Sequence, residues 1–565
     1  MTAGSAATDR VGFLDGVRRF GRSLKQPKTA YMMLFGFSSA LPYALLLGTL
    51  YAWLSDAEVD LETMGVFSLI GLTYAFKFLW SPLIDRISLP ILRKLGRRKQ
   101  WIVLAQFLLG GIMMLLSTLD PKGAIGVFSL LAGIGAFASA TQDVVVDAWR
   151  VDVADETATL DTLSTVYQLG YRAAVLVGGA LALFLADGFG WPTVYALMGA
   201  ILMGLGVVSL FAPENERVEA MTESVDQLRQ PGELNPRIRA VALGVVGLLW
   251  LWALGNVVQF MVRSLGADPE ARPDSVAFVS VQGPVIVIAT VVIPAMIAAW
   301  LAVMQRQGKY VLREAAPRTH WSDAVLDHGY RALVLPLTEI MGRLGWAAIL
   351  VLALVLSYRI TDTIWGTFAY PFYLDALGYT KSEVAVASKF FGVGALMLGV
   401  ALGGMLFAWM GRMAVMTLGA LTAALTNLLY ADLARGGMVM SAVSDYTGFS
   451  WLVAHLGGDE RLARLMVAIG GENIAGGIAG TALVAYLSSI TSKGYSAVQY
   501  ALLSSLTFLV GTLGRGALGK MIETQGYYPI FIFTTLLGGV AVVLCLLEWG
   551  RQARARVIPV QVEPE

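Results

Sequence analysis

Residues Tyr31–Leu54 read YMMLFGFSSALPYALLLGTLYAWL, an apolar run without Asp, Glu, Lys or Arg. About 20 mainly apolar residues are needed to cross the hydrocarbon core of a bilayer, so this run predicts a transmembrane helix. It is too long for the apolar core of a secretory signal peptide, and more runs of its kind follow. A basic arm precedes it, with Arg18, Arg19, Arg22, Lys25 and Lys28.

Composition agrees with a membrane protein. The chain is 56% hydrophobic and 14% charged, with a mean hydropathy of +0.66, whereas soluble domains carry about 25% charged residues. The net charge of +1 gives no reason to expect a nucleic-acid partner. One cysteine excludes a disulfide framework, and no His/Cys/Asp cluster has metal-ligand spacing. Without a phosphate-binding loop or a hydrolytic triad, we expect no enzyme, no metal and no cofactor.

Apolar runs of spanning length recur along the chain and predict about 14 transmembrane helices. Six precede the polar linker 212–239, two follow it, and six more come after a second polar stretch. The predicted spans lie near 31–54, 62–83, 101–119, 124–146, 163–186, 192–212, 239–262, 276–304, 344–368, 383–409, 413–431, 465–489, 497–518 and 527–549.

The loop charges give this topology an orientation. Lys and Arg concentrate in cytoplasmic loops of membrane proteins, so the basic arm is expected inside. Alternation then places the basic loops 83–101 and 305–343 and the tail 550–565 inside as well, while 55–62, with four acidic residues, lies outside. We therefore expect both termini to be cytoplasmic.

The last six spans repeat the pattern of the first six. DLETMGVFSLIG at 60–71 and TKSEVAVASKFF at 380–391 are similar entries to the second helix of each set, as expected for a transporter with duplicated halves. We predict an all-α membrane protein with two six-helix halves. Its parts are an arm (1–29), a first half (30–212), a linker with two extra helices and an amphipathic helix (213–343), a second half (344–549) and a tail (550–565).

Ser139–Arg150, SATQDVVVDAWR, is the stretch richest in chemistry. Asp143, Asp147 and Arg150 share one helix face because they are four and three residues apart. Carboxylates at membrane depth are costly and persist where they face a partner or a water-filled path. They can pair with Arg150 or Arg172, and a carboxylate in such a place can take up and release a proton. The alternative is a static ion-pair network between two helices.

Further polar residues interrupt apolar spans. Lys77 either lines a substrate path or extends to the membrane surface, and Glu472 is a second candidate for protonation. We predict that substrate contacts Lys77, Gln142, Asp143, Gln168, Tyr171, Arg172, Asp362, Asn427, Glu472 and Asn473.

SPLIDR at 81–86 followed by GRRKQW at 96–101 resembles the signature loop between the second and third helices of the major facilitator superfamily. The resemblance implies the major facilitator fold and a conformational latch of acidic and basic groups across the bundle. Asp85 and Arg86 match the acid and the base, and Arg97, Arg98 and Arg150 complete the expected latch. The alternative is an ordinary basic loop.

Several stretches together resemble the AmpG muropeptide permeases, a branch of this superfamily. They are GFSSALP (36–42), FKFLWSPL (76–83), QDVVVDAW (142–149), GYR (170–172), ENIAGG (472–477) and YSAVQYALLS (495–504). The resemblance implies proton-driven import of N-acetylglucosaminyl-1,6-anhydro-N-acetylmuramic acid and its peptides across the inner membrane of Gram-negative bacteria. That cargo feeds peptidoglycan recycling and, in some species, β-lactamase induction. The insertion 213–343 and the loop 432–461 are longer than expected, and Thr141 replaces a serine.

Two other functions remain open. One is transport of a different cargo, either a CoA ester or an amphipathic drug. The other is a receptor that binds without transport. Of the partners, we expect cargo, protons and the lipid bilayer, with the chain acting as a monomer.

Overall fold

The computed structural model is almost entirely helical where it is described, which confirms the all-α membrane fold. It describes residues 18, 20–59, 67, 69–84, 87, 89–214, 228–229, 232–266, 275–314, 316–317, 321–360, 368–513 and 521–557. Within these residues, 11 helices are long and apolar enough to cross a membrane, or up to 12 if one bent pair is a single span. The expected spans near 62–83, 344–368 and 497–518 each include residues outside the described part.

The described part of the first half consists of successive helical segments, the first of which is interrupted near a proline. Pro42 lies inside α2 (Pro27–Ala44), which continues through the π-helical turn η1 (Leu45–Thr49) into α3 (Leu50–Asp56). Proline lacks a backbone donor, so a change of hydrogen-bonding pattern close to it is expected. The rest are α5 (Leu69–Ala75), η3 (Lys77–Leu79), α6 (Ser81–Ile84), η4 (Arg93–Leu95), α7 (Lys99–Leu116), α8 (Ile125–Val153), α9 (Leu160–Leu176), η5 (Val177–Leu181), α10 (Ala182–Phe189) and α11 (Trp191–Ser209).

The chain bends sharply where the linker meets the second half. The amphipathic helix expected in the linker is divided into two, α16 (Trp321–Leu333) and α17 (Leu335–Leu344), because Pro336 lies in the first turn of a new helix. α17 meets α18 (Ala347–Ser357) at 105° across Gly345, whose φ is +55°. The remaining elements are α20 (Ala369–Pro371), η8 (Phe372–Ala376), α21 (Lys381–Ala385), η9 (Val386–Phe391), α22 (Gly392–Met410), α23 (Arg412–Leu433), α24 (Met438–Tyr446), α25 (Phe449–His455), α26 (Glu460–Ile490), η10 (Lys493–Tyr495), α27 (Ser496–Leu513) and α29 (Tyr527–Val557).

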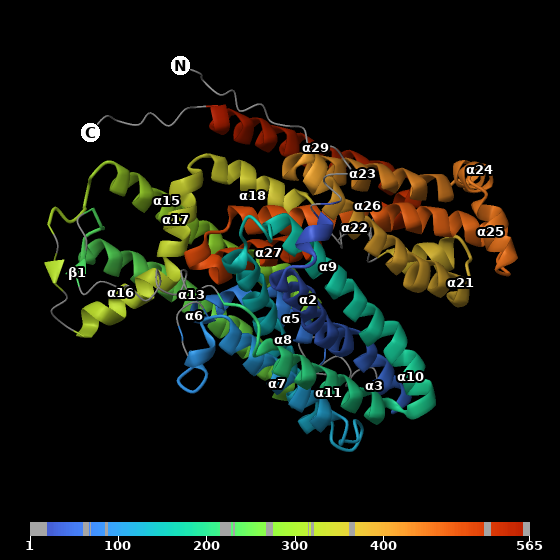
Figure 1. Cartoon of the computed structure of the whole chain (residues 1–565), viewed down its shortest axis with the longest axis horizontal. Helices are drawn as coiled ribbons and strands as arrows, with labels where there is room; N and C mark the ends of the chain where they lie inside the picture. The colour runs from blue at the N-terminus through green and yellow to red at the C-terminus, as the bar shows by residue number, and fades with distance from the viewer. Residues whose placement is uncertain are drawn as a thin grey trace.

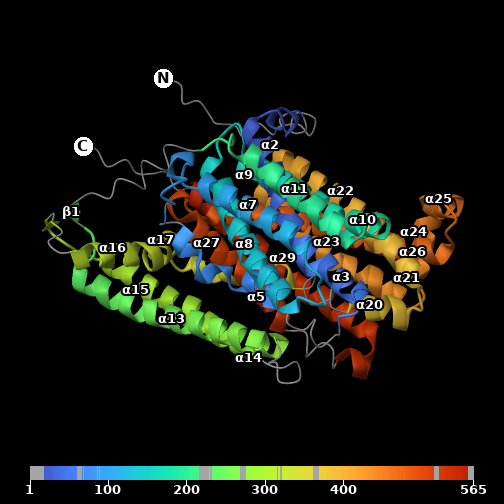
Figure 2. The same ribbon diagram turned by 90° about the horizontal axis from the view of Figure 1, so that it is seen from below.

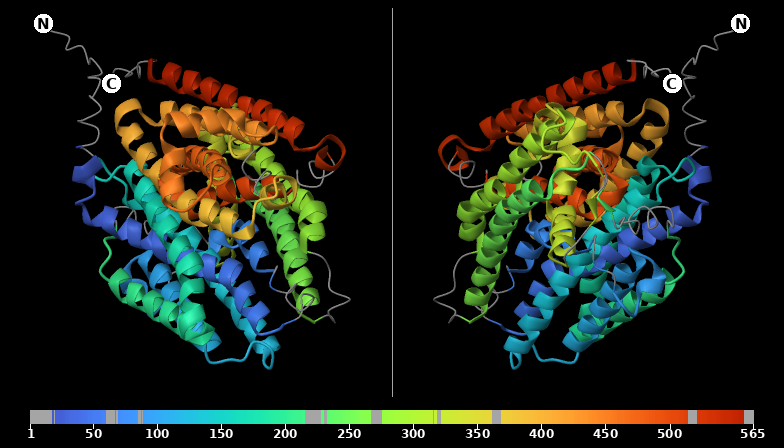
Figure 3. Two further views of the ribbon diagram at one scale, coloured as in Figure 1. Left: turned by 90° about the vertical axis from the view of Figure 1, so that its right-hand side faces the viewer. Right: turned by 90° about the vertical axis from the view of Figure 1, so that its left-hand side faces the viewer.

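The two halves form separate helix groups that meet most closely at one end. In Figure 1 the first half (blue to teal) and the second half (orange to red) lie together near α8, α9 and α27 and diverge toward α10 and α21. Figure 3, viewed along the bundle, shows the same two groups one above the other. We call the end where α8 finishes and α9 begins the closed end.

The inserted helices lie along one flank of the bundle (Figure 2). They are α13 (Pro236–Gly266) and the segment α14 (Ser275–Val287), η7 (Ile288–Val292) and α15 (Ile293–Arg306). Trp250 packs edge-on against Phe78 of the first half, and α14 contacts both α5 and α27. The pair therefore bridges the two halves on this flank. A two-residue ladder, β1 (Leu228–Arg229) with β2 (Ala316–Pro317), joins the linker ends beside it.

A glycine at the same point of each half supports the expected duplication. Gly96 precedes α7 with φ +98° and ψ 167°, and Gly411 precedes α23 with φ +79° and ψ 165°. Side chains disfavour this backbone conformation, so glycine is the residue that fits both turns. Each glycine is followed by arginine: Arg97 lies two residues before the first residue of α7, and Arg412 is the first residue of α23.

Candidate functional site

A buried ion cluster on α8 is the centre of the first half. Arg150 donates to Asp147 at 2.9 Å, and Lys77 forms an ion pair with Asp143 while its Nζ lies 4.0 Å from Asp147. Lys77 lies in η3, where the helix between α5 and α6 tightens, and its side chain is buried, so it does not extend to a membrane surface. We call Lys77, Asp143, Asp147 and Arg150 the ion cluster.

The two carboxylates of the ion cluster differ in their surroundings. Asp143 accepts hydrogen bonds from Ser39 and Tyr167, each at 3.0 Å, besides its ion pair with Lys77. Asp147 accepts a hydrogen bond at 2.9 Å from Arg150 on its own helix. Three different elements thus hold Asp143, whereas Asp147 depends mainly on Arg150.

Arg150 also connects the halves. Its Nε donates to Ser488 on α26 at 3.1 Å, and its guanidinium lies 4.9 Å from the ring centres of Tyr167 and of Tyr500 on α27. One side chain therefore joins a carboxylate of the first half to two helices of the second. Any change in charge at Asp147 acts directly on this contact.

Gln142 belongs to a different network although it precedes Asp143 in the chain. Its amide donates to Ser38 at 2.8 Å, Gln106 donates to the same hydroxyl at 2.9 Å, and Ser209 donates to Gln106 at 2.6 Å. Neighbouring residues point about 100° apart around a helix, so Gln142 and Asp143 face different surroundings. Gln142 is fully buried against α2. Cargo would reach it only after a rearrangement.

The predicted second-half residues are brought together only in part. Glu472 accepts a hydrogen bond from Tyr430, which also receives one from Tyr373 at 3.1 Å. Asn427 is buried and accepts from Thr534 at 3.2 Å, while Asn473 donates to the backbone of its own helix at Ile469. Asp362 lies outside the described residues.

Gln168, Tyr171 and Arg172 lie on α9, which faces the second half. Asp161 and Thr165 contact the second half at Arg412 and Gly404. Gln168 and Arg172 continue the same helical stripe at i+7 and i+11 from Asp161. Tyr171 lies beside it, with its ring 6.0 Å from that of Tyr167.

The closed end is held by an ion pair and by hydrogen bonds that cross between the halves. Arg98 donates to Asp152 and to Ser496 of α27, each at 2.8 Å, and Ser496 donates to Asp152 at 2.9 Å. Arg97 lies 3.7 Å from Asp152, and Arg412 of the second half pairs with Asp161 at 2.7 Å. Of the expected latch residues, Arg97, Arg98 and Arg150 thus lie at this seam, and Asp85 and Arg86 fall outside the described residues.

From the sequence alone, Asp152 could be a solvated charge at a helix end, and nothing indicated Asp161 or Arg412. Asp152 is buried with two arginines, so the solvated alternative is wrong. A repeated Gly-Arg pair in the sequence could have indicated Arg412. Gly411-Arg412 repeats Gly96-Arg97 at the matching loop of the second half.

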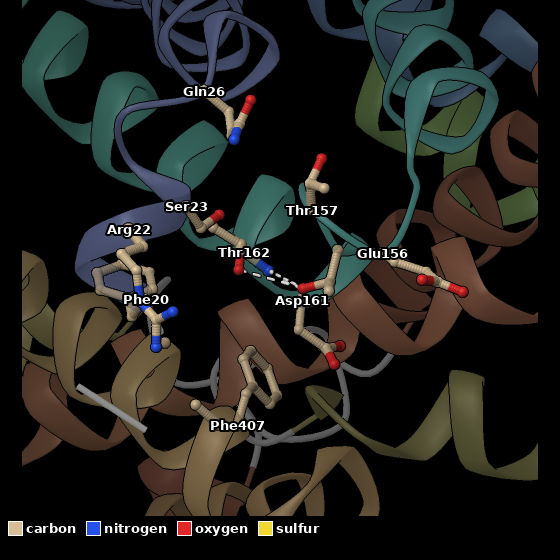
Figure 4. A pocket seen from close by; sticks show the side chains of 12 residues that line it. Phe20, Arg22, Ser23, Gln26, Glu156, Thr157, Asp161, Thr162 and Phe407 are labelled. Atoms are coloured by element: carbon tan, nitrogen blue, oxygen red, sulfur yellow. Dashed lines mark hydrogen bonds between the residues drawn. The ribbon is translucent and has the colours of Figure 1, made fainter. Parts of the chain in front are cut away.

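A cavity of about 470 Å³ lies beside the Arg412–Asp161 pair (Figure 4). The segment before α2, the start of α9 and the end of α22 line it, and no member of the ion cluster does. Nearby, Lys28 donates to Asp155 at 2.6 Å. Burial raises the pKa of Asp155, but hydrogen bonds from Lys28, Ala158 and Thr157 lower it further, so this carboxylate stays ionised and ties α2 to the loop before α9.

Gly404→Val is expected to open the closed end. A Cβ at Gly404 of α22 would lie 2.5 Å from Thr165 Cγ2 of α9, and overpacking such a contact costs roughly 1–3 kcal/mol. With Cys545 removed and Gln168→Cys as reporter, labelling by a maleimide from that side should rise about tenfold. Gly394→Val on the same helix, where a Cβ has open space, is the control. Equal labelling in both variants would show that the contact between Gly404 and Thr165 does not keep the closed end shut.

The sequence and fold comparisons agree with this architecture. Residues 29–267 match the family model described as Major Facilitator Superfamily. The anhydromuropeptide permease of Escherichia coli K12 is 28% identical over 530 residues, covering 93% of this chain and 80% of that protein. The putative transporter AmpG 4 of Rickettsia conorii is 24% identical over 522 residues, covering 92% and 96%.

Solved structures support the fold alone. The proton:xylose symporter XylE bound to 6-bromo-6-deoxy-D-glucose gives a TM-score of 0.50 at 12% identity, covering 95% of this chain and 96% of that one. A double-tryptophan mutant of XylE gives 0.53 at 14% identity, covering 94% and 95%. Among the described residues, no group of three or more His, Cys, Asp or Glu is placed to hold a metal ion.

Proposed function

We propose that this chain, which has the major facilitator fold and is a relative of the AmpG-like permeases, imports anhydro-muropeptides by alternating access driven by protons. Like the permeases that it resembles, the chain is a transporter and not an enzyme. One observation supports the mechanism above others: a buried carboxylate, Asp147, shares Arg150 with the second half. The cargo assignment is supported by similarity to the E. coli permease over 93% of the chain.

Asp147 is the carboxylate we propose for the coupling proton. Three groups donate to Asp143, whereas Asp147 relies on Arg150. When Asp147 is ionised, it holds Arg150 in place against Ser488 and Tyr500, and the closed end stays shut. When Asp147 gains a proton, Arg150 loses its charge partner, and the contact between the halves weakens. Proton uptake thereby favours opening of that end.

Cargo would bind between the halves near the middle of the membrane, as in other transporters with repeated halves. Tyr171 and Arg172 on α9 and Glu472 and Asn473 on α26 are partly exposed in the middle of long spans. Polar groups in such places are consistent with a path for polar cargo. Glu472, bonded to Tyr430, remains our second proton carrier.

We assign the closed end to the cytoplasmic face of the inner membrane, with both termini on that side. The seam lies next to the most basic loop of the chain, and basic loops stay in the cytoplasm. The basic residues there are Arg93, Lys94, Arg97, Arg98 and Lys99. The state described is then closed to the cytoplasm, the form in which an importer would receive periplasmic cargo. Imported cargo would feed peptidoglycan recycling, with the chain working as a monomer.

The test is uptake of radiolabelled N-acetylglucosaminyl-1,6-anhydro-N-acetylmuramic acid into proteoliposomes with an imposed pH gradient. We expect about tenfold accumulation per coupled proton for a gradient of about one pH unit, and equilibration only when a protonophore is added. Uptake that a protonophore leaves unchanged would refute proton coupling. No uptake, with flux of a CoA ester or a hydrophobic cation instead, would refute the cargo.

A further inference from the structure

The helices α24 and α25 form a hairpin, residues 438–456, at the end of the second half opposite the closed end (Figure 1, Figure 2). Ser450 donates to Ser444 between the two helices at 2.7 Å. Asp432 of α23 accepts from the backbone N–H of Met440 at 2.9 Å. The α24–α25 hairpin is therefore fixed to the bundle and is not a loose loop.

The α24–α25 hairpin has the composition of a buried segment, although most of its large side chains are exposed. Its sequence, MVMSAVSDYTGFSWLVAHL, carries one charged residue, Asp445. Met440 and Val453 are buried against the bundle. The large apolar and aromatic side chains with exposed fractions of 41% to 94% are Met438, Val439, Val443, Tyr446, Trp451, Leu452 and Leu456. An exposed apolar surface of this kind normally contacts a membrane or a partner.

The lengths of the neighbouring helices place the α24–α25 hairpin at the edge of the hydrocarbon core. α22 and α23 meet at Gly411, where Arg412 marks one edge of the core, and about 20 helical residues cross it. Counted from this turn, the opposite edge falls near Phe391 before α22 and close to the end of α23 at Leu433. The ring of Phe449 in α25 lies 5.6 Å from that of Phe391. Both spanning helices therefore give the hairpin the same level in the membrane.

An apolar stripe on α23 leads to the α24–α25 hairpin. Leu421, Leu425 and Leu428 are exposed at spacings of i, i+4 and i+7, so they form one stripe on the outside of a membrane-spanning helix. Arg435 follows at the end of α23, exposed, with its guanidinium carbon 3.4 Å from the ring centre of Tyr528. An arginine at this level can reach the phosphate groups of lipids while its stem stays on apolar surface. The lipid-facing surface of α23 thus continues into the hairpin.

We infer that the α24–α25 hairpin is a membrane anchor that lies in the headgroup region of the bilayer, with its exposed apolar side chains against the acyl chains. Tryptophan and tyrosine are enriched at this level of membrane proteins, as Trp451 and Tyr446 would be here. A water-soluble partner would be bound through a polar rim, and Asp445 is the one charged group that the hairpin offers. The anchor would hold its end of the second half at a fixed depth while the first half moves. It goes beyond the proposed function and does not depend on it.

The test measures membrane depth at single positions of the full chain in lipid nanodiscs, where both faces of the bilayer meet the solvent. In a Cys545→Ala background, Val439→Cys on α24 and Leu452→Cys on α25 carry an environment-sensitive fluorophore. The control is Lys122→Cys, at a side chain 61% exposed in the loop between α7 and α8. We expect iodide in the solvent to quench the hairpin positions about three- to tenfold less than the control. Lipids with a nitroxide near the headgroup should quench them more strongly than the control.

Three results would overturn the anchor. Equal quenching by iodide at all three positions would show that the hairpin lies in water. Protection from iodide without quenching by nitroxide lipids would show that protein covers it, either a second copy or another part of the chain. Lipid contact at only one of the two helices would show that the hairpin does not act as a unit. The melting temperature of each labelled variant checks folding, and Leu456→Cys replaces a position whose variant melts below the parent, with the same result expected.

Discussion

Asp147→Asn is expected to abolish uphill accumulation of cargo while leaving exchange across the membrane. Asparagine keeps the size of the side chain and an oxygen that can accept from Arg150 at the present 2.9 Å contact, but it cannot change charge. The variant should therefore behave as permanently protonated. With a gradient of about one pH unit, accumulation should fall from about tenfold per coupled proton to equality of the two sides.

Three measurements make this prediction specific to coupling. Counterflow exchange, which needs no gradient, should stay within about threefold of wild type, since cargo contacts are unchanged. Asp147→Glu keeps an ionisable group and should retain part of the accumulation. Asp187→Asn, at an exposed aspartate of α10, should transport normally. Full accumulation in Asp147→Asn would show that another residue carries the coupling proton, and Glu472 would be the next candidate.

Apolar runs predicted the helical elements well because membrane-spanning helices are specified locally. Backbone groups in lipid must be satisfied within their own helix, so each run determines its own structure. The spacing of Asp143, Asp147 and Arg150 likewise predicted a shared face, since all three lie on α8. The Asp147–Arg150 contact at 2.9 Å is a local consequence of that spacing.

Contacts between helices could not be predicted in this way. Lys77 was ambiguous because its direction depends on the tight turn η3, which apolar periodicity does not reveal. Gln142 was grouped with Asp143 by adjacency, although the rotation between them sends it to Ser38. Arg412 and Asp161 are 251 residues apart, and only the folded arrangement of the halves joins them.

Loss of either partner of the Lys77–Asp143 ion pair is expected to be more damaging than loss of both. Both side chains are largely buried, with exposed fractions of 8% and 16%. Removing one partner of a buried pair typically costs about 3–5 kcal/mol because the other charge is left uncompensated. Lys77→Met and Asp143→Asn should each lower thermal stability strongly and abolish uphill uptake.

The double variant Lys77→Met/Asp143→Asn tests why the single variants fail. It leaves no unpaired charge, so most of the lost stability should return, by about 2–4 kcal/mol relative to either single variant. Transport should return to a smaller extent, because Ser39 and Tyr167 then face an amide in place of a carboxylate. If the stability lost in the double variant equalled the sum of the losses in the two single variants, the residues would act independently. The ion pair would then not explain their burial. If Asp143→Asn alone accumulated cargo normally, the ion cluster would contain no more than one carboxylate essential for transport, namely Asp147.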